Sequence, residues 1–310
     1  MNIYISGSLA YDRIMDFPGY FSEHILPEKI HILNVSFTVN SMTEKFGGTA
    51  GNIAYTLKML GEKPLILATI GKDYHSYFEW LRVNGLDTNG IKIIQDEFTA
   101  GAYITTDKAD NQITGFNPGA MKHRSDFSFP GTSGETIGLM GPGNLGDMME
   151  FAKYYKAKNI PCICDPGQSL PSWKAEDLTE WISGTSILIA NDYELQLISN
   201  MTGKGRDELH QLVGTLIVTL GEKGSVISTS AGDIKIPAAK AGAVLDPTGA
   251  GDAYRAGLLK GLVTGKDIET SAKIGAVAAV YAVEKHGTQG HRFNYADFSQ
   301  RYKDNFGSEI

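Results

Sequence analysis

The sequence predicts an α/β fold, in which a doubly wound and mostly parallel sheet carries helices on both faces and a small β-sheet forms a lid. Short apolar runs alternate with amphipathic stretches along most of the 310 residues, a pattern typical of a parallel sheet covered by helices. The length and the hydrophobic fraction of 42% suit one large domain with a full core. Two segments in the N-terminal half, at about residues 13–45 and 91–122, interrupt the alternation.

The alternating elements are read from apolar runs with strand or helix spacing. Strands are expected at 2–6, 63–71, 136–142, 160–167, 185–191, 214–221, 224–230 and 232–238. Helices are expected at 47–61, 73–85, 144–158, 192–199, 249–263 and 267–287.

The two interrupting segments are rich in turns and β-type residues. In the second segment, residues 102–106 and 112–116 flank the polar turn 107–111, which is a hairpin signal. We expect the two segments to pair into a small β-lid over the main sheet. The alternative is a pair of long loops, which would be unusual inside a compact domain unless they were functional.

Composition excludes several classes of protein. The formal net charge of −7 and the pI near 5.5 give no basic surface for nucleic acid. No run is long and apolar enough to cross a bilayer, and the first residues lack the pattern of a signal peptide. Cys162 and Cys164 alternate along an expected strand, so they should be buried on one face without a disulfide between them. We therefore expect a cytoplasmic protein that has neither a nucleic-acid nor a membrane partner.

The stretch from Val244 to Val263, VLDPTGAGDAYRAGLLKGLV, combines a glycine turn with the start of a helix. Backbone N–H groups at Gly249, Ala250, Gly251 and Asp252 would lie at a helix N-terminus, where an anion is stabilised. Asp252 beside such an anion could act as a base, or it could simply cap the helix.

Two familiar phosphate-binding loops are absent. A P-loop needs Gly-Lys-Ser/Thr after its glycines, and that tripeptide does not occur in the sequence. The GAGDAY string has Tyr254 where a dinucleotide turn needs a third small residue, and it lies late in the chain. A nicotinamide enzyme is therefore not expected, whereas a hole of backbone amides suits charge on a transferred phosphoryl group.

The complete string DPTGAGD, residues 246–252, is similar to the C-terminal signature of the ribokinase-like (PfkB) family of carbohydrate and nucleoside kinases. The N-terminal signature of that family resembles GGTAGNIA, at 47–54. GSLAYD at 7–12, NDYE at 191–194 and TLGEKGS at 219–225 also resemble family motifs, in the expected order. Five ordered matches span nearly the whole chain, and the fold of the family is the doubly wound domain with a β-lid described above.

The resemblance implies a role for each matching residue. Asp252 would be the catalytic base, with Gly249, Ala250 and Gly251 as its anion hole. The acceptor would be held by Asp12, whose carboxylate can accept two hydrogen bonds from a vicinal diol, and by the turn residues Gly47, Gly48 and Asn52. The nucleotide site would comprise Asn191, Glu194, Thr219, Gly221, Gly224 and Ser225.

The resemblance also implies ATP and Mg²⁺ as cofactors, with Glu194 acting on the magnesium ion through water. Asp246 and Thr248 match positions where some family members bind a monovalent cation, so K⁺ is a further candidate. Each assignment has a structural alternative. Asp12 could be a loop acid, and Asn191 and Glu194 a helix cap with a first-turn acid. Gly221 and Gly224 could form an ordinary hairpin turn, and Asp246 could only brace its own turn.

The start SLAYD, the lid string NQITGFNPGAM and DPGQ at 165–168 are most similar to the prokaryotic adenosine and nucleoside kinase branch. A nucleobase needs a flat apolar slot, which Phe98, Tyr103 and Phe116 of the lid could supply unless they form its own small core. Gln112 and Asn117 could present an amide to a base edge.

The function expected from these matches is transfer of the γ-phosphoryl group of ATP to the 5′-hydroxyl of a nucleoside. Two alternatives stay open at this point: a kinase of free sugars such as ribose, and a non-catalytic sensor that binds a nucleoside or nucleotide. The protein would be a monomer or a homodimer formed through the lid, because an exposed sheet edge invites pairing.

Overall fold

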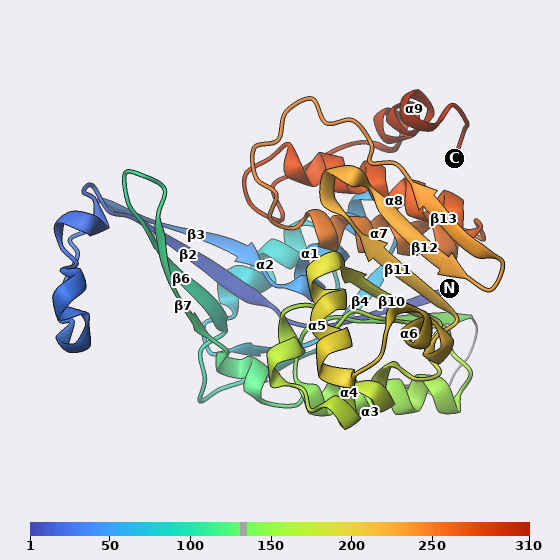
Figure 1. The fold of residues 1–310 in the computed structure, drawn as a ribbon, viewed down its shortest axis with the longest axis horizontal. Helices are drawn as coiled ribbons and strands as arrows, with labels where there is room; N and C mark the ends of the chain where they lie inside the picture. Colours follow the sequence, from blue (N-terminus) through green and yellow to red (C-terminus); the bar gives the residue numbers. More distant parts are fainter. Residues whose placement is uncertain (131–134) are drawn as a thin grey trace.

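The computed structural model describes residues 1–130 and 135–310. Within them, nine strands form one large sheet in the order β13-β12-β11-β10-β9-β8-β1-β4-β5 (Figure 1). These strands are β1 (Asn2–Ser6), β4 (Pro64–Gly71), β5 (Ile91–Ile94), β8 (Thr136–Met140), β9 (Cys162–Cys164), β10 (Ile187–Asn191), β11 (Thr215–Thr219), β12 (Ser225–Thr229) and β13 (Gly232–Ile236). The seven strands from β11 to β5 in this order are all parallel to one another. β12 and β13 form a hairpin at the other edge, and β12 pairs antiparallel with β11.

Helices cover both faces of this sheet because its strands send alternate apolar side chains to opposite sides. Ile3 and Ile5 of β1 pack with one set of helices, whereas Tyr4 between them packs with the other set. The first set is α1 (Thr49–Met59), α2 (His75–Val83), α7 (Ala250–Val263), α8 (Ile268–Val283) and α9 (Tyr295–Phe306). The second set is α3 (Leu145–Ala157), α4 (Ala175–Ile182), α5 (Asp192–Thr202) and α6 (Arg206–Leu212). The predicted doubly wound α/β fold is confirmed.

Cys162 and Cys164 follow the same alternation. Both are buried and free, and both lie in the core beneath the second set of helices, as the sequence predicted. Burial raises the pKa of each thiol, which disfavours the thiolate form. None of the helices in the described residues is long and apolar enough to cross a membrane.

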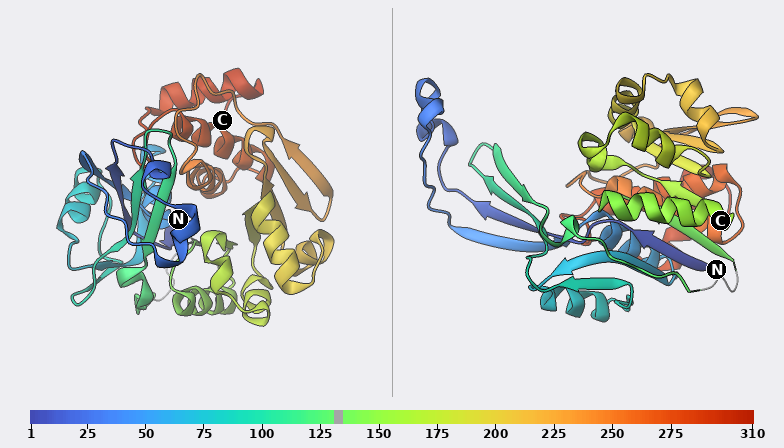
Figure 2. Two further views of the ribbon diagram at one scale, coloured as in Figure 1. Left: turned by 60° about the vertical axis from the view of Figure 1, so that its left-hand side comes forward. Right: turned by 90° about the horizontal axis from the view of Figure 1, so that it is seen from below.

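A second sheet of four strands, in the order β3-β2-β6-β7, projects from the body (Figures 1 and 2). Its strands are β2 (Ala10–Asp16), β3 (Ser41–Gly47), β6 (Ala100–Thr106) and β7 (Gln112–Asn117). The two interrupting segments therefore do pair into a small β-sheet, and the predicted 102–116 hairpin is the β6–β7 pair. Short 3₁₀ turns at Phe21–Glu23 and Pro27–Ile32 lie at the far end of this lid.

One strand differs from the expected lid boundary. β5, at the start of the 91–122 segment, pairs with β4 in the large sheet, with Ala68 opposite Ile91. The reason is that the short β-rich stretch from 91 to 94 can hydrogen-bond beside β4 before the chain reaches the lid at Ala100. Helices α4, α6 and α9 were not among the expected helices.

Glycines let α7 lie directly against α8. A Cβ atom on Gly257 would come within 2.6 Å of the Gly275 Cα, and one on Gly261 within 2.5 Å of the Ser271 Cα. The backbones of the two helices therefore approach each other too closely for any larger residue. This contact holds α7, whose N-terminus carries the end of the DPTGAGD string, directly against α8.

Candidate active site

The N-terminus of α7 is a turn with unpaired backbone donors. Gly249 caps the helix in a left-handed conformation, with φ of 81°, which favours glycine. The Ala250 N–H donates to the Pro247 carbonyl at 3.2 Å. In the described part of the chain, the N–H groups of Gly251 and Asp252 have no acceptor, so they are available to an anion.

Two adjoining cavities meet at this turn. The larger has a volume of about 670 Å³ and the smaller a volume of about 300 Å³, within the range of small-molecule sites. The residues that line both cavities are Thr49, Pro142, Gln168, Gly249 and Asp252. Asp252 therefore lies where the two cavities adjoin, so a chemical group could be transferred from a ligand in one cavity to a ligand in the other.

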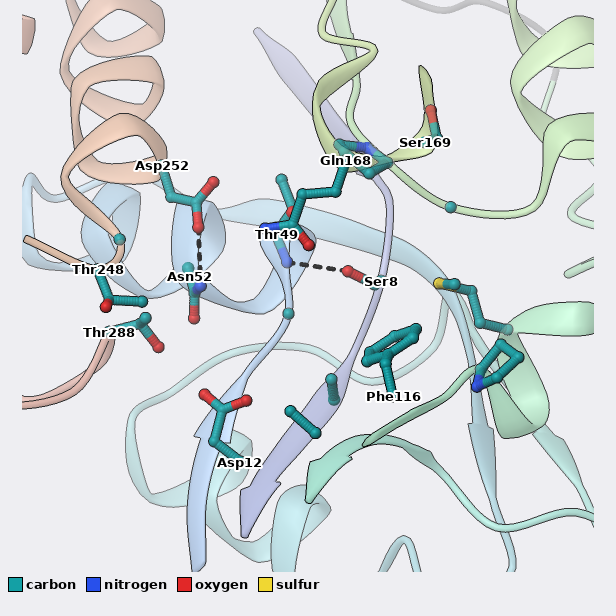
Figure 3. A pocket seen from close by; sticks show the side chains of 18 of the residues that line it. Ser8, Asp12, Thr49, Asn52, Phe116, Gln168, Ser169, Thr248, Asp252 and Thr288 are labelled. Atoms are coloured by element: carbon teal, nitrogen blue, oxygen red, sulfur yellow. Dashed lines mark hydrogen bonds between the residues drawn. The ribbon is translucent and has the colours of Figure 1, made fainter. Parts of the chain in front are cut away.

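The larger cavity lies between the lid and the body, and it has a polar side. Asp12 of β2, Asn52 of α1 and Asp252 of α7 line it together, although up to 240 residues separate them (Figure 3). The Asp12 carboxylate makes no hydrogen bond within the described residues, and its burial raises its pKa while Lys45 opposes that rise. This carboxylate is therefore free to accept hydrogen bonds from a ligand.

The glycine turn before α1 lets the lid strand approach Asp12. A Cβ atom on Gly47 would lie 2.8 Å from an Asp12 carboxylate oxygen. Gly48 has a φ of 88°, and a Cβ there would lie 2.6 Å from the Ser8 carbonyl oxygen. Any side chain at Gly47 would collide with the Asp12 carboxylate, and any side chain at Gly48 would collide with the backbone of Ser8. Both positions beside the larger cavity therefore require glycine.

The opposite side of the larger cavity is apolar. Phe116 of β7 lies there, across from Asp12 and Asp252 (Figure 3). Pro118, Met121 and Leu145 continue this wall, although sequence reasoning did not single them out. A flat apolar group could lie against it.

The other lid candidates do not line either cavity. Phe98 lies under the Lys72 ammonium, 4.2 Å from its ring centre, and the Tyr103 hydroxyl accepts from Arg13. Gln112 is exposed at the start of β7, and the Asn117 side chain accepts from the Gly119 N–H. Of the proposed base-contacting residues, the structure thus brings Phe116 alone to the cavity.

The environment of Asp252 suits a proton acceptor. Burial raises the pKa of this carboxyl from 3.8 to about 6, against the opposing effects of Arg255 and of a hydrogen bond from Asn52. The Asn52 amide nitrogen donates to an Asp252 oxygen at 2.8 Å. Asp165 and Glu194 add like charge and raise the pKa further. A base with a pKa near neutrality is well matched to general base catalysis.

Sequence reasoning missed Arg255, which lies one helical turn after Asp252. Its guanidinium donates to Asp165 at 2.8 Å and forms a buried ion pair with that residue. Both side chains are almost fully inaccessible, and both lie in the wall of the smaller cavity. The spacing of three residues from Asp252 was the available signal, because such residues share one helix face.

The smaller cavity contains most of the residues expected at the nucleotide. Asn191 and Glu194 form a capping box at the start of α5, each side chain accepting from the other residue's backbone N–H, at 2.7 and 2.8 Å. Asn191 and Glu194 therefore do cap the helix, as the structural alternative supposed. Both residues also line the smaller cavity, together with Thr219 and Gly221. Burial raises the pKa of Glu194.

Gly224 and Ser225 lie outside both cavities. A Cβ atom on Gly224 would be 2.0 Å from the Ile236 carbonyl oxygen, so glycine is needed there to pack against β13. The Ser225 hydroxyl is buried and hydrogen-bonded to the Tyr254 hydroxyl at 2.8 Å. Ala250 likewise lines neither cavity, and its N–H is used within the turn.

Asp246 braces the loop before α7. Its carboxylate accepts from the N–H groups of Thr248 and Gly287, at 2.9 and 2.8 Å, and these bonds help to hold its pKa below the usual range. Thr248 lines the larger cavity. Among the described residues, no three His, Cys, Asp or Glu side chains gather as a metal cage.

Comparisons with known proteins agree with this geometry. A nucleoside kinase of Methanocaldococcus jannaschii is 38% identical over 264 residues, covering 84% of this chain and 87% of that protein. A nucleoside kinase of Methanothermobacter thermautotrophicus is 28% identical over 89% of this chain and 90% of its own length. The structure of Burkholderia thailandensis nucleoside kinase in complex with inosine is 35% identical, with a TM-score of 0.87 over 99% of this chain and 98% of that one.

The family model for pfkB family carbohydrate kinases matches residues 11–292. The match runs from the strand that carries Asp12 to the segment after α8, so it includes most of the lid, most residues of both cavities and Asp252. This chain therefore belongs to the pfkB family of carbohydrate kinases, phosphotransferases that act on a hydroxyl group.

Proposed function

We propose that this protein is an ATP-dependent nucleoside kinase that phosphorylates the 5′-hydroxyl group. The observation that carries the proposal is the position of Asp252 on the wall shared by the two cavities, beside unpaired backbone donors. The larger cavity would hold the nucleoside and the smaller one the triphosphate. We further propose that lid and body work as one kinase domain, in the cytoplasm.

The larger cavity suits both parts of a nucleoside. The free carboxylate of Asp12 can accept two hydrogen bonds from the ribose diol. The wall containing Phe116 and Met121 offers apolar surface to a base. The likeness to the Burkholderia thailandensis enzyme, which has been solved with inosine, supports a nucleoside over a free sugar.

The transfer step follows from the groups around Asp252. The Asp252 carboxylate accepts the proton of the 5′-hydroxyl as the hydroxyl oxygen attacks the γ-phosphorus. The bond between the γ-phosphorus and the oxygen that bridges it to the β-phosphorus then breaks, and ADP leaves. The N–H groups of Gly251 and Asp252 donate to the charge on the transferred group. Closure of the lid would exclude water from the same position.

A magnesium ion bound with the triphosphate would lie in the smaller cavity beside Glu194. One Glu194 oxygen accepts the Asn191 N–H, which leaves the other oxygen for a metal-bound water. Bound there with the triphosphate, the ion would neutralise phosphate charge. Asp246, a candidate ligand for K⁺, already accepts hydrogen bonds from two backbone N–H groups. A titration of activity with K⁺ tests whether the enzyme also needs a monovalent cation.

The test is a phosphorylation assay with purified protein, ATP and Mg²⁺, in which adenosine, inosine, cytidine and ribose are offered side by side. Faster ADP release with a nucleoside than with ribose, together with a 5′-monophosphate product, supports the proposal. Preference for ribose would make the protein a sugar kinase. Binding of nucleoside and ATP without ADP release would indicate a sensor.

A further inference from the structure

We propose that Gln289 is a positioning residue that fixes the side-chain amide of Asn52 so that its nitrogen faces the base Asp252. The proposal rests on the proposed function, because Asp252 is the base of that reaction. Gln289 lies in the segment after α8, outside every motif that the sequence analysis singled out. It contacts neither cavity and would act only through Asn52.

Four side chains from four parts of the chain form a continuous series of hydrogen bonds. The Trp80 indole N–H of α2 donates to the Gln289 carbonyl oxygen at 2.7 Å. The Gln289 amide nitrogen donates to the Asn52 carbonyl oxygen at 3.0 Å. The Asn52 amide nitrogen then donates to Asp252 at 2.8 Å.

The direction of this series is set at its far end. An indole nitrogen can only donate a hydrogen bond, so the Gln289 oxygen must face Trp80 and its nitrogen must face Asn52. The Asn52 oxygen has to meet that nitrogen, and the Asn52 nitrogen is left to face Asp252. One group that cannot accept therefore determines the orientation of two amides.

Tyr77 reinforces this arrangement. Its hydroxyl donates to the Gly47 carbonyl at 2.7 Å, so it is left to accept from the Gln289 nitrogen at 3.0 Å. Gln289 is 5% exposed and Asn52 is 4% exposed, so water cannot readily replace a lost partner. The Gln289 amide is thus held by three groups and cannot turn over without breaking all three contacts.

The orientation matters because Asp252 has few favourable neighbours. Arg255 of α7 attracts its charge, whereas Asp165 after β9 and Glu194 of α5 repel it. Asn52 of α1 supplies the neutral donor. If the Asn52 amide turned over, its carbonyl oxygen would face the carboxylate, which would lose that donor and face an additional repulsion.

The test is a double-mutant cycle on turnover with saturating nucleoside and ATP. Gln289→Met keeps the approximate length of the side chain but removes its donor and acceptor. We expect it to lower kcat by about 10- to 100-fold, the range for losing a hydrogen bond to a charged group, with the KM for ATP unchanged. Because Gln289 acts through Asn52, the double variant with Asn52→Ala should be no slower than Asn52→Ala alone.

Trp80→Phe is a second, milder variant. It keeps the ring stacked on Phe46 but removes the indole N–H that sets the direction of the series. We expect a smaller loss of kcat that also disappears when Asn52 is already alanine. The matched control is Tyr55→Phe, which removes a buried hydrogen bond from α1 to the same segment, at His291, outside the series. It should lower thermal stability and leave kcat unchanged.

A readout without turnover separates this proposal from the proposed function. The Asn52 side-chain amide signal in a ¹⁵N NMR spectrum, identified by its absence in Asn52→Ala, should shift in Gln289→Met and stay in place in Tyr55→Phe. If the wild-type protein phosphorylates ribose only, the proposed function fails, and the cycle is run with ribose. An Asn52 amide signal that does not move in Gln289→Met would overturn the role of Gln289. So would a loss of kcat in the double variant that equals, within about twofold, the product of the losses in Gln289→Met and Asn52→Ala.

Discussion

Replacing Asp252 by Asn should stabilise the folded protein while removing most of its activity. The substitution keeps the shape of the side chain, and the new amide oxygen can still accept the hydrogen bond from Asn52. It removes a negative charge from a buried site that already contains Asp165 and Glu194. The two effects have opposite signs because the group that the reaction needs is costly to bury in its charged form.

The magnitude of each effect follows from the site. Burial, reinforced by Asp165 and Glu194, raises the pKa of Asp252 from 3.8 to about 6 against the opposing effects of Arg255 and Asn52. About two pKa units correspond to about 3 kcal/mol of folding free energy. The stability that the neutral carboxyl has at acid pH is lost as the pH rises through about 6. Asparagine is neutral throughout, so the variant should be the more stable protein at pH 8 by about 3 kcal/mol. Loss of a general base should lower kcat by about 10²- to 10⁴-fold.

The assay combines ADP release, nucleoside titration by calorimetry and urea denaturation between pH 4 and 8. We expect nucleoside binding to be largely retained, because Asp12 and the apolar wall are untouched. Near-normal turnover would refute the assignment of Asp252 as base. A variant less stable than wild type at pH 8, or a stability difference that does not shrink towards pH 4, would refute the burial argument.

Three further predictions test the rest of the site. Asp12→Asn should raise the KM for nucleoside by about 10- to 100-fold with the KM for ATP unchanged, because it halves the acceptors offered to the diol; equal changes in both constants would contradict that role. In the wild-type enzyme, kcat/KM for nucleoside should fall as the pH drops through about 6, where Asp252 gains a proton, and a flat profile from pH 5 to 8 would count against it. Arg255→Met should destabilise the protein by about 3–5 kcal/mol in urea denaturation, because Asp165 is left buried without its partner, and adding Asp165→Leu should recover much of that loss.

The sequence predicted the main fold well because its signals are local. Strands with apolar alternation and helices with apolar faces can be recognised within one short window, and the β6–β7 hairpin has a polar turn between two β-rich runs. β5 was misassigned to the lid because a strand of four residues, Ile91–Ile94, carries no information on which sheet it joins. Pairing partners depend on residues far away in the chain.

The candidate site likewise contains residues that motifs could identify and residues whose position depends on the folded structure. Asp12, Asn52 and Asp252 were proposed through family motifs, and no spacing along the chain would have placed them in one cavity. Phe98 and Tyr103 were aromatic lid residues with the same local character as Phe116, yet their positions differ in three dimensions. Which face of a lid strand lies over a cavity is decided only when the lid docks.

Gln289 and Arg255 had no signal strong enough to be noticed. A glutamine in a loop and an arginine on a helix usually lie at the surface, where they are solvated. Here both are buried, since each meets its partners from distant segments. Polar residues of this kind become recognisable as site components only after burial and hydrogen bonding are known.

The close contact between α7 and α8 has a consequence for how the enzyme moves. Two backbones packed at glycines leave little room for sliding or rotation, so we expect the helix N-terminus that carries Asp252 to move little relative to α8. We therefore expect access for the acceptor to depend on movement of the β3-β2-β6-β7 sheet about the points where it joins the body. Engineering for larger acceptors, or for acceptors that dissociate more slowly, should therefore change the points where the lid sheet joins the body and leave the α7–α8 contact unchanged.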